Sequence, residues 1–134
     1  MQAIKARITK GIMHGTKVET CDNSGAKIVR IISVKGAKTV KNRIASAGVG
    51  DLLRVSVVSG RPDMRKQVVP AVVVRQKKEY RRLEGMRVKF EDNAVVIMKD
   101  DKAGTPKGTI FKGAIAKEAT SRWPGLAKVA KIVV

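Results

Sequence analysis

Aromatic side chains are scarce in this 134-residue chain, which has two Phe, one Tyr and one Trp. Proteins that read single-stranded nucleic acid usually stack bases on such side chains, so their scarcity argues against a base-stacking surface. Cysteine is almost absent as well, because Cys21 is the only one. A single cysteine excludes an internal disulfide and a multi-cysteine metal site, and it is typical of a reducing compartment.

Motifs that carry catalysis are also missing. The single histidine, His14, lies in GIMHGTK without a partner for general-base chemistry. The adjacent carboxylates of Asp100 and Asp101 fall in a solvated turn and do not resemble an opposed acid–base pair. The sequence has no Walker-type loop, no His-Glu-x-x-His and no Cys-x-x-Cys, and GVGD lacks the third glycine of a dinucleotide-binding turn. We therefore expect no enzyme activity, no cofactor and no metal.

Long apolar runs do not occur. No stretch approaches the roughly 18 residues of a membrane span, and MQAIKARITK lacks the apolar core of a signal peptide. These features predict a cytoplasmic protein that does not enter a membrane. The length predicts a single domain over residues 1–134.

Positive charge is what the sequence has in excess. Its 29 Lys and Arg outnumber 11 Asp and Glu, which gives a net charge of +18. Like charges repel one another in the compact state, and solubility needs a net charge of only roughly 2–8. The excess therefore predicts a polyanionic partner, of which nucleic acid is the natural example.

Short β-branched segments predict a sheet, because stiff side chains pack well on a pleated surface. The segment 16–36 reads as two strands joined by a turn at DNSG, and further strands are expected at 51–60, 68–76, 86–90 and 93–98. The segment 35–50 reads as a basic loop. Strands this short and this closely connected predict an all-β fold, a small closed antiparallel barrel over about 16–98.

The remaining part of the chain, about 99–134, changes character. A glycine-rich loop precedes an alanine-rich stretch in which Pro124 is suited to open a helix. We expect two short helices, roughly 115–122 and 124–130, which pack Trp123 and Leu126 against the barrel.

Three basic stretches, 35–43, 61–66 and 75–82, fall between predicted strands. Loops at a barrel rim carry charge without entering the core, and Lys and Arg there neutralise phosphates. Charge without stacking residues predicts a folded RNA that is read by its shape and backbone. The side chains expected to contact RNA are Lys35, Lys38, Lys41, Arg43, Arg54, Arg61, Arg65, Lys66, Arg75, Lys77, Lys78, Arg81 and Arg82.

The segment 71–97 resembles the signature of the universal large-subunit ribosomal protein number fourteen family. Its matching parts are, in order, Ala71, Val72–Val74, Glu84–Gly85, Phe90, Asn93 and Val96–Ile97. One departure is Glu84, where the family pattern has Asp, Asn or Ser. CDNSGAK, IISVKG, AGVGDLLRVSV and KGTIFKGAIAKE resemble family segments in the same order. MQAIKARITKG, FEDNA and RWP are similar to the archaeal and eukaryotic branch.

The resemblance implies a five-stranded barrel with small C-terminal helices. It also implies a structural constituent of the large ribosomal subunit that binds large-subunit rRNA, touches neighbouring ribosomal proteins and contributes to a bridge with small-subunit rRNA. For this branch the resemblance implies that an anti-association initiation factor docks beside the protein. By analogy with the bacterial silencing factor, the 107–113 loop and the first C-terminal helix are candidate docking surface, and the residues that match the family there are Lys107, Gly108, Thr109 and Phe111.

Two other binding functions remain open from the sequence. A free translation factor or RNA chaperone with an oligonucleotide-binding barrel would need a stacking face. An architectural DNA-binding protein would offer apolar wedges or minor-groove arms. Occupancy in cells separates these possibilities from a ribosomal protein.

Overall fold

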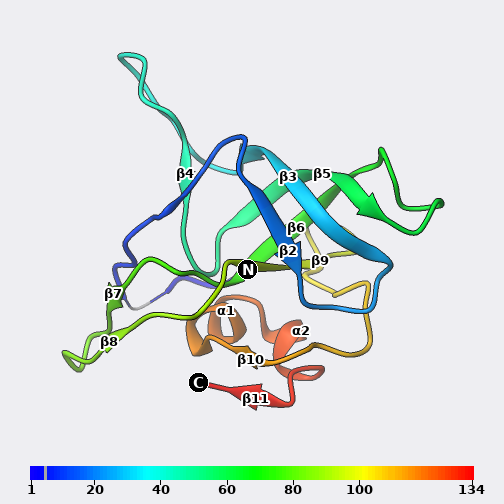
Figure 1. Cartoon of the computed structure of the whole chain (residues 1–134). Helices are drawn as coiled ribbons and strands as arrows, with labels where there is room; N and C mark the ends of the chain where they lie inside the picture. Colours follow the sequence, from blue (N-terminus) through cyan, green and yellow to red (C-terminus); the bar gives the residue numbers. More distant parts are fainter. Residues whose placement is uncertain (5) are drawn as a thin grey trace.

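The computed structural model describes residues 1–4 and 6–134. Five strands close into a barrel, and Figure 1 shows how the elements are arranged around it. In order around the barrel they are β2 (Lys17–Thr20), β3 (Ala26–Val34), β5 (Leu52–Gly60), β6 (Val68–Arg75) and β9 (Ala94–Ile97). The predicted all-β, closed five-stranded barrel is therefore confirmed.

The barrel is mixed and not wholly antiparallel. Consecutive strands from β2 to β9 pair antiparallel, but β2 and β9 pair parallel, with Glu19 opposite Ala94 and Thr20 opposite Val95. An odd number of strands that alternate in direction around a closed ring must leave one parallel pair. The prediction of an antiparallel barrel thus holds for every neighbouring pair except the one that closes it.

Alternation along β5 decides which side chains fill the barrel. Leu53, Val55 and Val57 are buried, whereas Arg54 between them is exposed. In β6 the run Ala71–Val74 is buried throughout, since the C-terminal region covers its outer face. There the N–H of Ala116 donates to the carbonyl of Val74 at 3.1 Å. Burial of each such valine contributes about 1.5–3 kcal/mol to folding.

Short two-stranded sheets accompany the barrel in the described part of the chain. β1 (Ile12–Met13) pairs with β4 (Ser46–Ala47), β7 (Tyr80–Arg81) with β8 (Arg87–Val88), and β10 (Ala114–Ile115) with β11 (Ile132–Val133). The segment 35–50, predicted as a loop, therefore contains β4. The strand predicted over 86–90 is shorter than expected, because its partner β7 is only two residues long.

Two short helices follow, α1 (Lys117–Arg122) and α2 (Pro124–Ala127), as the sequence predicts, although α1 begins after residue 115, which lies in β10, and α2 ends before residue 130. Pro124 begins α2, where its missing N–H has no intrahelical partner to lose. Trp123, between the helices, is buried and its indole N–H donates to the carbonyl of Gly50 at 2.9 Å. Leu126 is buried beside it in the same hydrophobic cluster. The helices are thus fixed to the barrel by the residues predicted to pack there.

The buried residues form one hydrophobic cluster that runs from the barrel interior to the helices. Within the described residues, the buried polar or charged side chains are Asp22, Gln76, Arg82 and Glu118. Each of these makes hydrogen bonds across elements distant in sequence. Neither described helix has the length and apolar character needed to cross a bilayer.

Candidate nucleic-acid interface

The 35–45 loop projects away from the barrel and is drawn in cyan at the upper left of Figure 1. Its tip is a turn in which the N–H of Arg43 donates to the carbonyl of Val40 at 3.3 Å. Lys41 and Asn42 in this turn have φ values of 57° and 60°. Two successive positive φ angles are characteristic of the tight turns that join hairpin arms. All the predicted cations of this loop, Lys35, Lys38, Lys41 and Arg43, are exposed.

The 61–66 turn projects from another side of the barrel, after β5 (Figure 1). Met64 is buried at 2% exposure, and the N–H of Arg61 donates to the carbonyl of Gly25 at 2.9 Å. The turn is therefore anchored, while Arg61, Arg65 and Lys66 remain exposed. Arg65 donates from Nε to the carbonyl of Gly60 at 3.0 Å and is exposed as a residue.

The cations of the 75–82 segment fall into two groups, those that are exposed and those that are bonded within the protein. Lys77, Lys78 and Arg81 are exposed. Arg75 has a side chain only 14% exposed, which lies beside Asp92 with Nε 3.0 Å from Oδ1. Its Nη1 donates to the carbonyl of Lys112 at 2.9 Å and to the carbonyl of Ala114 at 3.2 Å. Arg75 therefore holds the C-terminal loop to the barrel.

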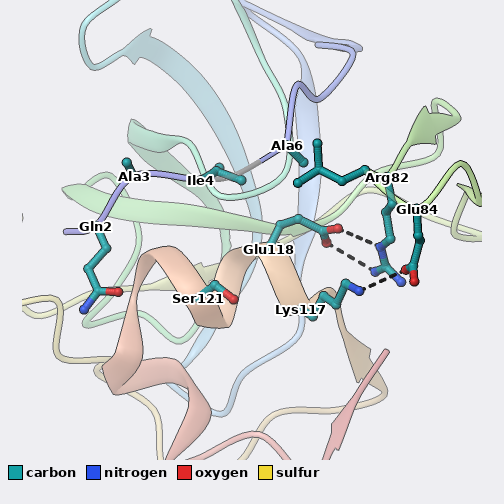
Figure 2. A pocket seen from close by; sticks show the side chains of 10 residues that line it. Gln2, Ala3, Ile4, Ala6, Arg82, Glu84, Lys117, Glu118 and Ser121 are labelled. Carbon is teal, nitrogen blue, oxygen red and sulfur yellow. Dashed lines mark hydrogen bonds and ion pairs between the residues drawn. The ribbon is translucent and has the colours of Figure 1, made fainter.

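Arg82 is buried at 7% exposure and forms an ion pair with Glu118, which is buried at 5% (Figure 2). Its Nε donates to Oε1 at 2.6 Å and its Nη2 to Oε2 at 3.2 Å. The hydroxyl of Tyr80 donates to the same carboxylate at 3.0 Å, and Arg82 also donates to the carbonyl of Val134 at 2.6 Å. These bonds join the β7–β8 hairpin to α1 and to the residue that follows β11.

Arg75 and Arg82 were both predicted to contact RNA, and in the structure their guanidinium groups are bonded within the protein. Their acidic partners, Asp92 and Glu118, are distant in sequence, so the local pattern RQKKEYRRLEG could not reveal the pairing. Arg54 differs from them, since its side chain is 51% exposed and lies 3.7 Å from Asp101 in a loose surface pair. Such exposed pairs contribute little to stability and leave the guanidinium accessible.

Aromatic side chains provide no stacking surface in the described structure. Tyr80, Phe111 and Trp123 are each at most 2% exposed, and Phe90 is partly buried. A protein that binds single strands by base stacking presents such rings to solvent. The exposed surface therefore offers charge for phosphates without a platform for bases.

The predicted docking loop is only partly accessible. Phe111 is buried at 2% and Gly108 is buried against Asn23, so neither contributes a side chain to a surface. Asn23 accepts the N–H groups of Thr109 at 2.8 Å and Ile110 at 3.3 Å. The exposed residues of the loop include Lys107, Thr109 and Ile110, of which Ile110 was missed by the sequence reasoning.

The titratable side chains do not indicate a reactive group. Burial raises the pKa of Cys21 to about 12, so its thiol is protonated at neutral pH. Burial also raises the pKa of Asp22. Its carboxylate accepts the N–H of Ile97 at 3.0 Å and so holds the DNSG turn to β9. Within residues 1–4 and 6–134, no group of three His, Cys, Asp or Glu side chains is placed to hold a metal ion.

Comparison with known proteins decides the family. The family model described as ribosomal protein L14p/L23e matches residues 11–134. The chain belongs to this family. It is 56% identical over 134 residues to the large ribosomal subunit protein uL14 of Nanoarchaeum equitans, with all of both chains covered. It is 48% identical to the protein of the same name from Methanococcus vannielii and 47% identical to one from Methanococcus maripaludis, with 99% of each chain covered. The resemblance to the archaeal and eukaryotic branch is thereby confirmed, with relatives of the archaeal type.

Proposed function

We propose that this chain is a structural constituent of the large ribosomal subunit in the cytoplasm and acts without catalysis. The observation that carries the proposal is its full-length similarity to proteins named large ribosomal subunit protein uL14. The net charge of +18 supports it, because an integral ribosomal protein must lie among phosphates.

The chain binds large-subunit rRNA through its exposed basic loops. Every cation predicted for this role except Arg75 and Arg82 is exposed. The loops 35–45 and 61–66 leave the barrel on different sides (Figure 1), so a rigid barrel between them would hold separate RNA segments at a fixed distance. Cations on anchored loops lose little freedom when a phosphate arrives, which favours binding.

The chain also contacts neighbouring ribosomal proteins, and small-subunit rRNA across the subunit interface. For an anti-association initiation factor, the exposed part of the 107–113 loop around Lys107, Thr109 and Ile110 is the surface on offer. Ile110, at 48% exposure, supplies the apolar contact that the buried Phe111 cannot.

The experiment that tests the function is sedimentation of gently lysed cells in sucrose gradients at low and high magnesium. We expect the protein to migrate with free large subunits and with joined ribosomes, and to be absent from free small subunits. Protein confined to the top of the gradient would overturn the ribosomal function and favour a free RNA-binding or DNA-binding protein.

A further inference from the structure

A basic cleft lies between the N-terminal segment and the base of the 35–45 loop. Its volume is about 670 Å³, within the roughly 300–1,000 Å³ typical of small-ligand sites. Arg7, Lys10, Lys35 and Arg122 line it from three separate parts of the chain, and its one acidic lining residue among those described is Asp51. Arg7 and Lys10 are outside the cations that the sequence pattern singled out.

Asp51 is already paired and does not neutralise the other cations that line the cleft. Oδ1 of Asp51 accepts Nη1 of Arg122 at 2.9 Å, and Oδ2 accepts the N–H of Gly48 at 2.8 Å. Asp51 and Arg122 therefore compensate each other. Among the described residues Arg7 and Lys10 have no ion pair, and Lys35 lies a loose 3.9 Å from Asp101. The cleft thus holds positive charge that the protein does not neutralise.

The walls of the cleft are fixed in place by a buried hub. Gln76 is fully buried, and its Nε2 donates to the carbonyl of Thr9 at 2.8 Å. Its Oε1 accepts the N–H of Val49 at 3.0 Å, so one side chain joins the N-terminal segment to the opposite wall. At the other end, the N–H of Gln2 donates to the carbonyl of Arg122 at 2.9 Å. Arg7 consequently lies two residues before Thr9, whose carbonyl is held by Gln76.

An exposed stretch of backbone without a side chain also borders the cleft. Gly36 lines it with a φ of 81°, and a Cβ added there would meet no atom within 4 Å. Exposed backbone without a side chain, together with cations from separate parts of the chain, suits a phosphate group.

We propose that this cleft binds a phosphate of the RNA backbone through Arg7, Lys10 and Lys35. The inference rests on the proposed rRNA-binding function and assigns it a defined site. Gln76 is a positioning residue, because it holds the walls of the cleft and lies too deep to touch the RNA.

The test compares two variants of the full chain with equal loss of charge. One carries Arg7→Gln, Lys10→Gln and Lys35→Gln, and the control carries Lys27→Gln, Lys128→Gln and Lys131→Gln, whose exposed side chains do not line the cleft. Binding to a transcript of large-subunit rRNA is measured as a function of salt. We expect the cleft variant to lose about tenfold or more in affinity relative to the control, with a shallower salt slope. Equal losses in the two variants would overturn the cleft while leaving the proposed function intact. Failure of the wild-type chain to bind the transcript would count against the proposed function itself.

A second measurement separates an RNA phosphate from a free nucleotide. Inorganic pyrophosphate and ATP are titrated into the isotope-labelled chain, and the amide resonances of Gly36, Gly48 and Val49 are followed. We expect weak binding of pyrophosphate to shift these signals, with displacement by the rRNA transcript. Tight ATP binding that the transcript does not displace would overturn the RNA assignment. Absence of any shift with pyrophosphate would overturn the phosphate site. Fluorescence of Trp123, which is bonded to Gly50 near the cleft, reports whether each variant is folded.

Discussion

Arg82 and Glu118 form a buried, two-point ion pair between the β7–β8 hairpin and α1, with Nε 2.6 Å from Oε1. The same guanidinium donates to the carbonyl of Val134, so three parts of the chain meet at one side chain. Its neighbour Arg81 is exposed and has no part in this network. Arg82 therefore binds groups within the protein, whereas the adjacent Arg81 is exposed to solvent.

Replacing Arg82 with Gln is expected to destabilise the fold strongly. The change leaves the Glu118 carboxylate buried without its partner, and breaking a buried ion pair from one side typically costs about 3–5 kcal/mol. The matched change Arg81→Gln should alter the free energy of unfolding by less than about 0.5 kcal/mol, because its side chain is exposed. Urea unfolding followed by Trp123 fluorescence measures both. Equal stability of the two variants would contradict the structural role of Arg82.

Tyr80 is expected to titrate late. Burial of the ring, followed by the charge of Glu118, raises the pKa of Tyr80 to about 12. A group with a higher pKa in the folded state binds its proton more tightly there. The stability it contributes is complete below its unfolded pKa of about 10 and is lost as pH rises toward 12. Stability should therefore fall over this alkaline range.

The measurement is direct because Tyr80 is the only tyrosine. Tyrosinate absorbance of the folded protein should begin to rise at a clearly higher pH than in urea. Glu118→Gln removes one of the two leading causes and should shift the rise to lower pH. A folded-state titration that coincides with the one in urea would show that the hydroxyl is solvated.

The barrel was predictable because its signals are local. Alternation in β5 and the DNSG turn before β3 each lie within a few residues, and period-two patterning specifies which face is buried. The ion pairs of Arg75 and Arg82 within the protein were not predictable, because their carboxylate partners come from elements that only folding brings near. The burial of Phe111 has the same origin, because it bridges to Asp22 far back in the chain. Long-range pairing, and not composition, separates these side chains from the exposed cations beside them.

Asn23 is expected to fix the loop that carries Thr109 and Ile110. Its side-chain oxygen accepts both of their N–H groups, and each such bond contributes about 0.5–1.5 kcal/mol. Asn23→Ala should therefore speed hydrogen exchange of these two amides by about tenfold. Asn93→Ala provides the control, since Asn93 accepts the N–H of Lys77 at 2.7 Å. It should release the Lys77 amide and leave Thr109 and Ile110 unchanged. Unchanged protection of both loop amides in Asn23→Ala would show that the loop is held by other contacts.

The exposed cations of the 75–82 segment give the last prediction. Lys77→Gln, Lys78→Gln and Arg81→Gln together should weaken binding to large-subunit rRNA without affecting the fold, because all three side chains are exposed. Each phosphate contact contributes about −0.7 to −0.9 to the slope of log affinity against log salt, so the triple variant should flatten the slope by up to about 2–3. Arg75 and Arg82 are kept unchanged in this variant, so that a loss of affinity cannot come from a loss of structure. A wild-type affinity that is insensitive to salt would refute the electrostatic mechanism, and a triple variant with the wild-type slope would remove this segment from the RNA-binding surface.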